Sequence, residues 1–263
     1  MSHLTIQYCS DLHLEFPKNE QFIRANPIHP VAPILVLAGD IVPLGSISRF
    51  NWFFDRLANE FEQVIWVPGN HEYYRENLDT YEHPLHREIR NNIALVNDTT
   101  INYEGVNFIA ATLWSKISIQ NAWMIERCMN DFHVIKTGRS RFSSVGANLL
   151  HRKSRAFIRE ELEKLNGCPV VVCSHHVPTF MNYPEQYKGD SLNEAFATEL
   201  SPLIEKFGPY AWIFGHHHVN IPAFKIGKTQ ILTNQLGYID RNEHARYSSE
   251  AYFEIDRNRT EKQ

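Results

Sequence analysis

The sequence has few cysteines, no excess of positive charge and no long apolar run. Only four of its 263 residues are cysteine, and no two have the C-x-x-C spacing, so a secreted disulfide scaffold is not expected. No segment approaches the roughly 18 consecutive apolar residues of a membrane span. The first residues also lack a charged segment followed by an apolar stretch and a cleavage site. We therefore expect free thiols, no membrane partner and a cytoplasmic location.

The composition is that of an ordinary globular protein. A formal net charge of -4 excludes a generally basic protein that coats nucleic acid. Hydrophobic residues make up 43% of the chain and charged residues 21%. This length and composition indicate one large domain covering residues 1–263.

Short apolar runs rich in β-branched residues recur and predict strands buried on both faces. These runs are residues 4–9, 34–38, 63–67, 106–114, 169–173 and 211–214. Helical spacing of apolar residues appears between them, over 47–61 and 144–165. Ser191 to Glu194 reads as a capping box that opens a further helix.

The pattern changes after residue 221. Short strands around turns, at 223–233 and 251–256, favour hairpin connections over crossovers. Together the elements predict a layered α/β domain with a central mixed sheet. The least regular stretch, at about 115–150, is expected to form a cap insertion over one end of the sheet.

Residues that bind metals follow five of the predicted strands directly. They are Asp11 and His13, Asp40, Asn70, His175, and the pair His216 and His218. Ligands of α/β sheets bind beyond the carboxyl ends of the strands, so these side chains are expected to converge. If residues 216–218 are extended, His216 and His218 face one side and His217 the other.

The mixture of donor atoms indicates the kind of metal. Carboxylate and amide oxygens combined with imidazole nitrogens suit Mn, Fe or Zn better than calcium. Seven ligands are too many for one such ion and fit two divalent ions that share one carboxylate. Paired ions about 3.5–4 Å apart can clamp a phosphoryl group and hold an attacking hydroxide between them. The sequence therefore predicts a phosphate ester hydrolase.

The same residues resemble the motifs of the calcineurin-like metallophosphoesterases. The family pattern is D-x-H, G-D, G-N-H-E/D, a lone histidine after a strand, and G-H-x-H. Here it is matched in order by Asp11 to His13, Gly39-Asp40, Gly69 to Glu72, His175, and Gly215 to His218. Each motif alone is weak evidence, but the ordered set is specific.

The resemblance implies a role for each matched residue. It places a first metal on Asp11, His13 and His218, a second on Asn70, His175 and His216, and Asp40 between the two. His71 would bind no metal and would hold the phosphate or protonate the leaving oxygen, a role that suits the ordinary pKa of histidine. Attack on phosphorus would come from a hydroxide that bridges the metals.

The resemblance also implies a four-layer α/β/β/α sandwich with mixed sheets. The second motif reads GDIVPLG instead of the G-D-x-V-D-R-G of the protein phosphatases, so a bacterial phosphodiesterase-like member is predicted. Asn234 to Tyr238, NQLGY, is similar to the N-P-R-G-Y-type segment of some bacterial members. It lacks the arginine of that segment.

Two other functions remain open at this point. One is a phosphomonoesterase or nucleotidase, and the other is a non-catalytic scaffold of the same fold. The retained ligand positions argue against the scaffold, but fold alone does not exclude it. Neither the natural substrate nor the oligomeric state follows from the sequence.

Contacts with the substrate are only weakly indicated. His176 and His217 adjoin expected ligands, and a supporting or solvent-facing role fits them equally well. Asp131 and His133 are candidates from the expected cap. Seven basic residues and no acidic one lie between Phe132 and Arg159. This excess would attract a nucleotide or oligonucleotide, or it forms a solvated helix face.

Overall fold

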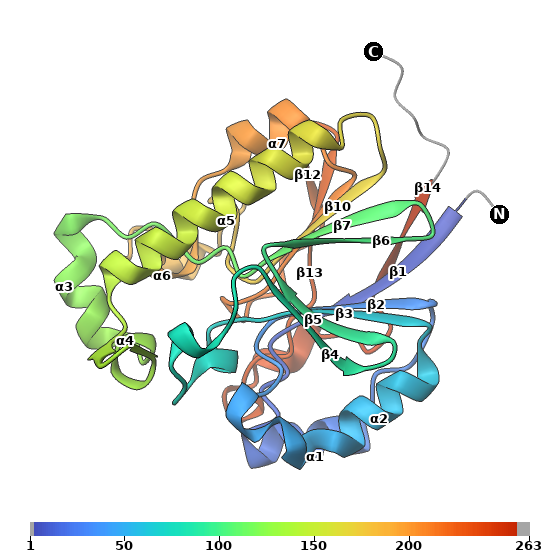
Figure 1. Ribbon diagram of the computed structural model, residues 1–263, viewed down its shortest axis with the longest axis horizontal. Coiled ribbons are helices and arrows are strands. Elements are labelled where there is room, and N and C mark those ends of the chain that lie inside the picture. The colour runs from blue at the N-terminus through green and yellow to red at the C-terminus, as the bar shows by residue number, and fades with distance from the viewer. Residues whose placement is uncertain (1–2, 257–263) are drawn as a thin grey trace.

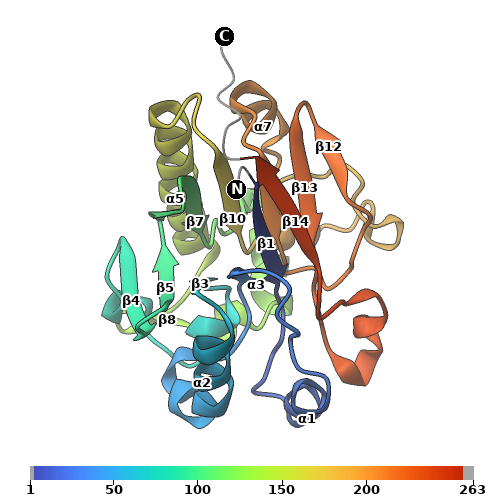
Figure 2. The same cartoon turned by 90° about the vertical axis from the view of Figure 1, so that its right-hand side faces the viewer.

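The chain folds around two β-sheets that face each other. The computed structural model describes residues 3–256, and in this part of the chain each large sheet has six strands. Figure 1 shows the sheets in the middle of the molecule with helices on both outer sides. Figure 2 shows α1 and α2 at one end of this stack and α5 and α7 at the other.

The first sheet has the strand order β14-β1-β2-β3-β5-β4. Its four inner strands are parallel, and its edge strands β14 and β4 are antiparallel to their neighbours. The strands are β1 (His3–Cys9), β2 (Ile34–Ala38), β3 (Gln63–Val67), β4 (Leu85–Arg90), β5 (Ile93–Asn97) and β14 (Tyr252–Asp256).

The second sheet has the order β12-β13-β11-β10-β7-β6 and the same mixed character. Strands β7, β10, β11 and β13 are parallel, and β6 and β12 form antiparallel edges. The strands are β6 (Thr99–Tyr103), β7 (Val106–Ala111), β10 (Val170–Ser174), β11 (Ala211–Phe214), β12 (Phe224–Ile226) and β13 (Thr229–Thr233).

The helices cover the outer faces of the sheets. The longer ones are α1 (Pro17–Ala25), α2 (Asn51–Glu60), α3 (Ile119–Cys128), α5 (Ser144–Lys164) and α7 (Ser201–Phe207). The remaining elements are η1 (Leu44–Phe50), η2 (His71–Tyr73), η3 (Leu78–Thr80), α4 (Asp131–Val134), the ribbon of β8 (Lys136–Thr137) and β9 (Ser140–Arg141), η4 (Glu185–Tyr187), α6 (Asn193–Phe196), η5 (Ile239–Arg241) and η6 (Glu243–Arg246).

Three layers of buried side chains hold the stack together. Phe54 of α2 stacks on Trp66 of β3 beneath the first sheet. Phe108 lies in the layer between the two sheets. Ile158 of α5 and Trp212 of β11 belong to the layer on the far side of the second sheet. Burial of apolar surface on both faces of both sheets is the main stabilising contribution, and the expected α/β/β/α sandwich is confirmed.

Most predicted elements are present, and the differences have physical causes. The six predicted strands are found, and 223–233 forms the expected hairpin of β12 and β13. The strand at 251–256 is no part of a hairpin, because β14 pairs with β1. The capping box was also wrong. Leu192 occupies the N-cap of α6, and Glu194 accepts a hydrogen bond from the backbone of Ser118 instead.

The stretch at 115–150 forms α3, α4, the β8–β9 ribbon and the start of α5. Its description as a cap within a single 1–263 domain stays a proposal. The helices within residues 3–256 include none with the length and apolar character needed to cross a membrane. The location of the protein in the cell stays a prediction.

Candidate metal centre

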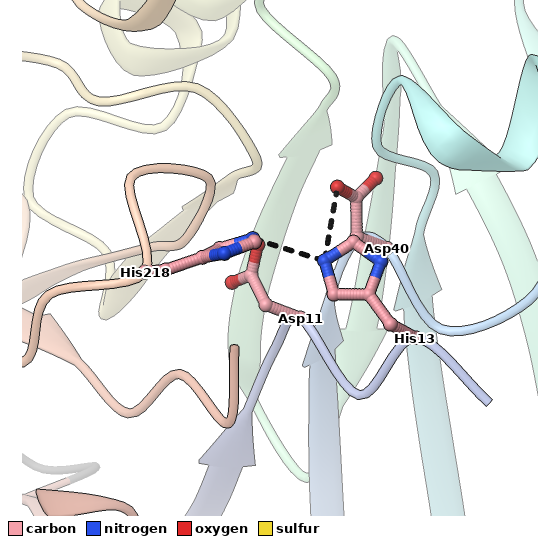
Figure 3. Close-up of side chains that lie close together, drawn as sticks. All are labelled: Asp11, His13, Asp40 and His218. Carbon is pink, nitrogen blue, oxygen red and sulfur yellow. Dashed lines mark hydrogen bonds and ion pairs between the residues drawn. The ribbon is translucent and has the colours of Figure 1, made fainter. Parts of the chain in front are cut away.

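The loops after β1, β2 and β11 bring four expected ligands together. Donor atoms of Asp11, His13, Asp40 and His218 lie within 4.8 Å of one another. Nε2 of His13 is 2.9 Å from Nε2 of His218 and 3.7 Å from Oδ2 of Asp40. Figure 3 shows the two imidazoles and the two carboxylates meeting, with Asp11 and His13 on the same loop. All but His218 are buried, and His218 is mostly shielded from solvent.

A second group lies beside the first and shares one member with it. Asp40, His175 and His216 also have donor atoms within 4.8 Å of one another. Nε2 of His175 is 3.0 Å from Nδ1 of His216 and 3.0 Å from the side-chain oxygen of Asn70. Asp40 is therefore the one residue common to both groups, with Oδ2 3.4 Å from Nε2 of His175.

The backbone at the ligands is left-handed at five of seven positions. The φ angles are +57° at Asp11, +48° at His13, +56° at Asp40, +82° at His216 and +54° at His218. Such angles are costly for residues with a Cβ and persist where the surrounding structure enforces them, typically at functional sites. Residues 216–218 are thus not extended as expected, although His216 and His218 still serve the centre.

Glycines allow the loops to approach the ligands closely. A Cβ on Gly39, whose φ is +93°, would overlap the ring of His175, and one on Gly69 would overlap the carboxylate of Asp40. A Cβ on Gly215 would lie 2.5 Å from Oδ2 of Asp11. No side chain fits at these three positions without moving a ligand.

Each imidazole is oriented by an acceptor at its other ring nitrogen. His175 faces the carbonyl of Ala38 at 2.9 Å, and His216 faces the carbonyl of Ala195 at 3.3 Å. His218 faces Glu243 at 2.7 Å.

The fourth imidazole, His13, faces Oε1 of Glu15 at 3.4 Å. Supporting acceptors of this kind fix the tautomer and orientation of metal-binding histidines. Glu243 and Glu15 were missed from the sequence. Of the two, only Glu15 could have been noticed in the sequence, because it lies two residues after the expected ligand His13 in SDLHLEF.

Glu72 ties the loops of the centre together. Its carboxylate accepts hydrogen bonds from the backbone N–H groups of Asp40 (2.8 Å), Ile41 (2.7 Å) and Gly69 (2.6 Å), and from the indole of Trp66 (3.2 Å). Burial and the nearby charge of Asp40 raise the pKa of Glu72 to about 7. The glutamate of the G-N-H-E/D motif thus holds neighbouring loops together, a role that the spacing of the motif did not reveal.

His71 lies against the first group without joining the expected ligands. Its Nδ1 is 2.8 Å from Oε1 of Glu15, and its ring centroid is 4.4 Å from that of His13. The ring stacks on Tyr74 at 3.9 Å, and Nε2 is 3.4 Å from the hydroxyl of Tyr238. The buried ring is therefore held from three sides beside the centre.

The four weaker candidates occupy different places. Asp131 accepts hydrogen bonds from the amide of Asn70 at 2.9 Å and the hydroxyl of Tyr74 at 2.8 Å. It thereby turns the amide oxygen of Asn70 toward His175. His133 is exposed, and its Nε2 contacts the carbonyl of Arg127.

The other two weaker candidates are buried. His176 packs against His216 at 4.1 Å, with Nδ1 3.2 Å from the carbonyl of Thr112. Nδ1 of His217 accepts a hydrogen bond from the side-chain amide of Gln235 at 3.0 Å. These contacts explain their positions through packing and hydrogen bonding.

Charges within the centre shift the pKa values of its ligands. Burial raises the pKa of Asp40, but the neighbouring His175 and His71 hold it well below its ordinary value. Burial lowers the pKa of His175, but Asp40 raises it to about 9. Burial also lowers the pKa of His218, and its hydrogen bonds with Asp11 and Glu243 raise it to about 10.

The residues present fit a pair of divalent cations. Ring nitrogens of four histidines point at one another inside a buried site instead of at hydrogen-bond donors. Their outer nitrogens are already held, so the inner ones are free to bind metal. The oxygen and nitrogen donor set suits a transition metal, as expected from the sequence. The identity and number of ions stay predictions.

Comparison with known proteins places these residues in a family. The family model described as calcineurin-like phosphoesterase matches residues 4–220. The chain is 30% identical over 279 residues to uncharacterized protein L509 of Acanthamoeba polyphaga mimivirus, covering 95% of this chain and 96% of that protein. The chain therefore belongs to the calcineurin-like phosphoesterase family and is a metal-dependent phosphoric ester hydrolase.

Two further similarities concern one Mycobacterium tuberculosis protein. The chain is 36% identical to [acyl-carrier-protein] phosphodiesterase PptH over 77 residues, which is 28% of this chain and 22% of that protein. The crystal structure of phosphopantetheinyl hydrolase (PptH) superposes with a TM-score of 0.69 and 18% identity, covering 97% of this chain and 96% of that one. The superposition shows a shared fold.

Metal binding is expected to release protons and to strengthen as the pH rises. In the metal-free protein, His175 and His218 are protonated at neutral pH, because their pKa values are about 9 and 10. A ligating nitrogen must lose its proton, so fewer protons are displaced at higher pH. Titration calorimetry with Mn²⁺ at pH 7, in buffers of different ionisation enthalpy, measures the protons released. Binding without any release would contradict this ligand assignment.

Replacing the shared carboxylate is expected to affect both metals. Asp40→Asn removes the charge common to the two groups, so both ions should bind more weakly. His216→Ala removes a ligand of the second group alone and should leave one ion bound. Metal content after dialysis, measured by mass spectrometry, distinguishes them, with Lys225→Ala as an exposed control. An unchanged content in Asp40→Asn would exclude a shared ligand.

Proposed function

We propose that the chain is a phosphodiesterase that uses two divalent metal ions held by the seven expected ligands. The observation that carries the proposal is the membership of Asp40 in both ligand groups. When bound, the ions would neutralise charge on the phosphoryl oxygens and lower the pKa of the attacking water. The protein itself holds the ligands in place through the supporting contacts of Glu72, Glu243 and the backbone.

His71 is proposed to protonate the leaving oxygen. Glu15 accepts a hydrogen bond from Nδ1, which directs Nε2 away from Glu15 and toward the hydroxyl of Tyr238. A histidine fixed in this way beside a metal centre suits general acid catalysis, which contributes about 10²–10⁴-fold. His71 is a catalytic residue in this proposal, and Glu15 positions it.

The charge around the centre favours a diester over a monoester. Among the described residues, none of the hydrogen bonds and ion pairs made by the seven expected ligands involves lysine or arginine, and the second motif has no arginine. A monoester carries about two negative charges near neutral pH and gains most from such cations, whereas a diester carries one. The mostly acidic and neutral surroundings therefore support diester hydrolysis.

The substrate proposed for testing first is the phosphodiester that joins a phosphopantetheinyl group to an acyl carrier protein. The supporting observation is the 36% identity to a segment of a protein named for that activity. A nucleotide or oligonucleotide, which the basic stretch at 132–159 would attract unless it forms only a solvated helix face and loop, remains the alternative.

The first experiment compares a diester with a monoester on Mn²⁺-loaded protein. We expect faster turnover of bis-p-nitrophenyl phosphate than of p-nitrophenyl phosphate. Asp40→Asn should abolish both rates. His71→Ala should retain its metals and slow the hydrolysis of diphenyl phosphate, whose poorer leaving group needs a proton, by about 100-fold. Faster turnover of the monoester would favour a phosphomonoesterase. No turnover of either compound would count against the proposed function.

A second experiment tests whether Glu15 acts through His71. Glu15→Gln keeps an acceptor but removes the charge that orients the imidazole. We expect diphenyl phosphate hydrolysis to fall by about 10–100-fold and bis-p-nitrophenyl phosphate hydrolysis to fall less, because p-nitrophenolate leaves without much help from an acid. Glu20→Gln is the matched control. An equal fall on both substrates, or a loss of metal, would show that Glu15 acts through His13 instead.

A further inference from the structure

One segment of the chain differs sharply in charge from the rest. Residues 115–159, here called the cap segment, contain nine lysines and arginines and two acidic residues. The whole chain has 26 basic and 30 acidic residues, so the remainder is strongly acidic. Both acidic side chains of the cap segment are engaged internally, Glu126 by Ser144 and Asp131 by Asn70. The nine cations are all exposed.

The same segment exposes large apolar side chains. On α3, Ile119 is 93% exposed and Trp123 is 69% exposed. On α5, Val145 is 75% exposed and Leu149 is 46% exposed. Each pair is spaced by four residues, so its two members lie on one face of their helix.

Hydrogen bonds hold these two helices side by side. The side chain of Asn148 on α5 bonds both the N–H and the carbonyl of Ile117, directly before α3. Glu126 near the end of α3 accepts from Ser144 at the start of α5. Figure 1 shows α3 beside the first half of α5 at one edge of the molecule.

Cations lie next to the exposed apolar side chains. The guanidinium of Arg127 lies 4.7 Å from the ring centroid of Trp123. Arg152 follows Leu149 by one helical turn and is exposed. We call the set Ile119, Trp123, Arg127, Val145, Leu149 and Arg152 the cap face.

The cap segment is connected directly to the metal centre. Asp131 of α4 holds the amide of Asn70, and the N–H of Arg75 donates to the carbonyl of Val134 at 3.1 Å. A molecule that rests on the cap face therefore lies on the same segment of the chain as the residues that contact Asn70 and Arg75.

We propose that the cap face docks an acidic protein that carries the phosphodiester substrate, an inference that rests on the proposed function. Nine exposed cations are complementary to a partner of negative charge. Aliphatic and aromatic side chains among them suit the apolar core of a protein interface. Nucleic acid bases would stack on aromatic rings but gain little from Ile119, Val145 and Leu149. A second copy of this chain is a poorer occupant. Its own cap segment is equally basic and would repel the cap face, and its acidic remainder carries no attached phosphodiester.

The experiment uses full-length, Mn²⁺-loaded protein with holo-acyl carrier protein as the acidic probe. The variant Trp123→Ala/Arg152→Glu removes an apolar and a cationic part of the cap face. Its matched control, Tyr252→Ala/Lys225→Glu, makes the same kinds of change on strands β14 and β12. Figure 2 shows β12 on the opposite side of the molecule from α5.

We expect the cap variant to raise KM for holo-acyl carrier protein by about tenfold or more, with kcat nearly unchanged. Its rate on bis-p-nitrophenyl phosphate should match the wild type, and the control variant should match it on both substrates. An equal loss on both substrates would overturn docking at the cap face.

Two other results would also overturn the docking proposal, and both can be told apart from a failure of the proposed phosphodiesterase function. Wild-type protein that hydrolyses bis-p-nitrophenyl phosphate, yet neither cleaves nor saturably binds the carrier protein, refutes docking and retains the phosphodiesterase. A variant that loses turnover of a single-stranded oligonucleotide, but not of the carrier protein, identifies a nucleic acid surface instead. Failure to hydrolyse the small diester refutes the proposed function itself.

Discussion

The candidate metal centre depends on one buried carboxylate that is not among its expected ligands. Glu72 receives hydrogen bonds from the backbone after β2 and from the backbone after β3, and it is itself buried at 0% exposure. Its acceptor oxygens compensate for N–H groups that the sharp turns leave without strand partners. Together with the hydrogen bond from the N–H of His71 to Oδ1 of Asp40, it joins the loops that carry Asp40 and Asn70. With these contacts, both ligands are parts of one rigid body.

The backbone at the other expected ligands is strained, and the surrounding sandwich holds it in that conformation. Five ligands have left-handed backbone angles, and each such residue costs about 1–3 kcal/mol. The strands before these loops are buried on both faces. Their burial offsets this free-energy cost and keeps the strand ends fixed, so the loops cannot relax. Stability is thus concentrated in the three core layers, and the loops at the strand ends carry the chemistry.

Much of the fold and of the centre followed from local sequence patterns. Apolar runs identified most inner strands but missed β5, although all five of its residues are buried. Residue types at the strand ends gave the seven expected ligands. Edge strands β4 and β6 were missed because their exposed faces are polar, as in REIR or TTIN. Glu243 and Glu72 could not be assigned from spacing, since their roles arise from contacts between segments. The alternation assumed for 216–218 failed because tight turns replace extended chain there.

The pairing of β1 with β14 joins the two ends of the described chain. Asp11 and His13 follow β1 at once, yet the edge of their strand is completed only by residues 252–256. The ligand His218 and its support Glu243 are likewise translated late. Contacts this distant in sequence form slowly, since a long loop must close first. During synthesis on the ribosome, a nascent chain therefore carries four of the seven expected ligands, which lie within its first 70 residues, long before it can assemble the whole centre.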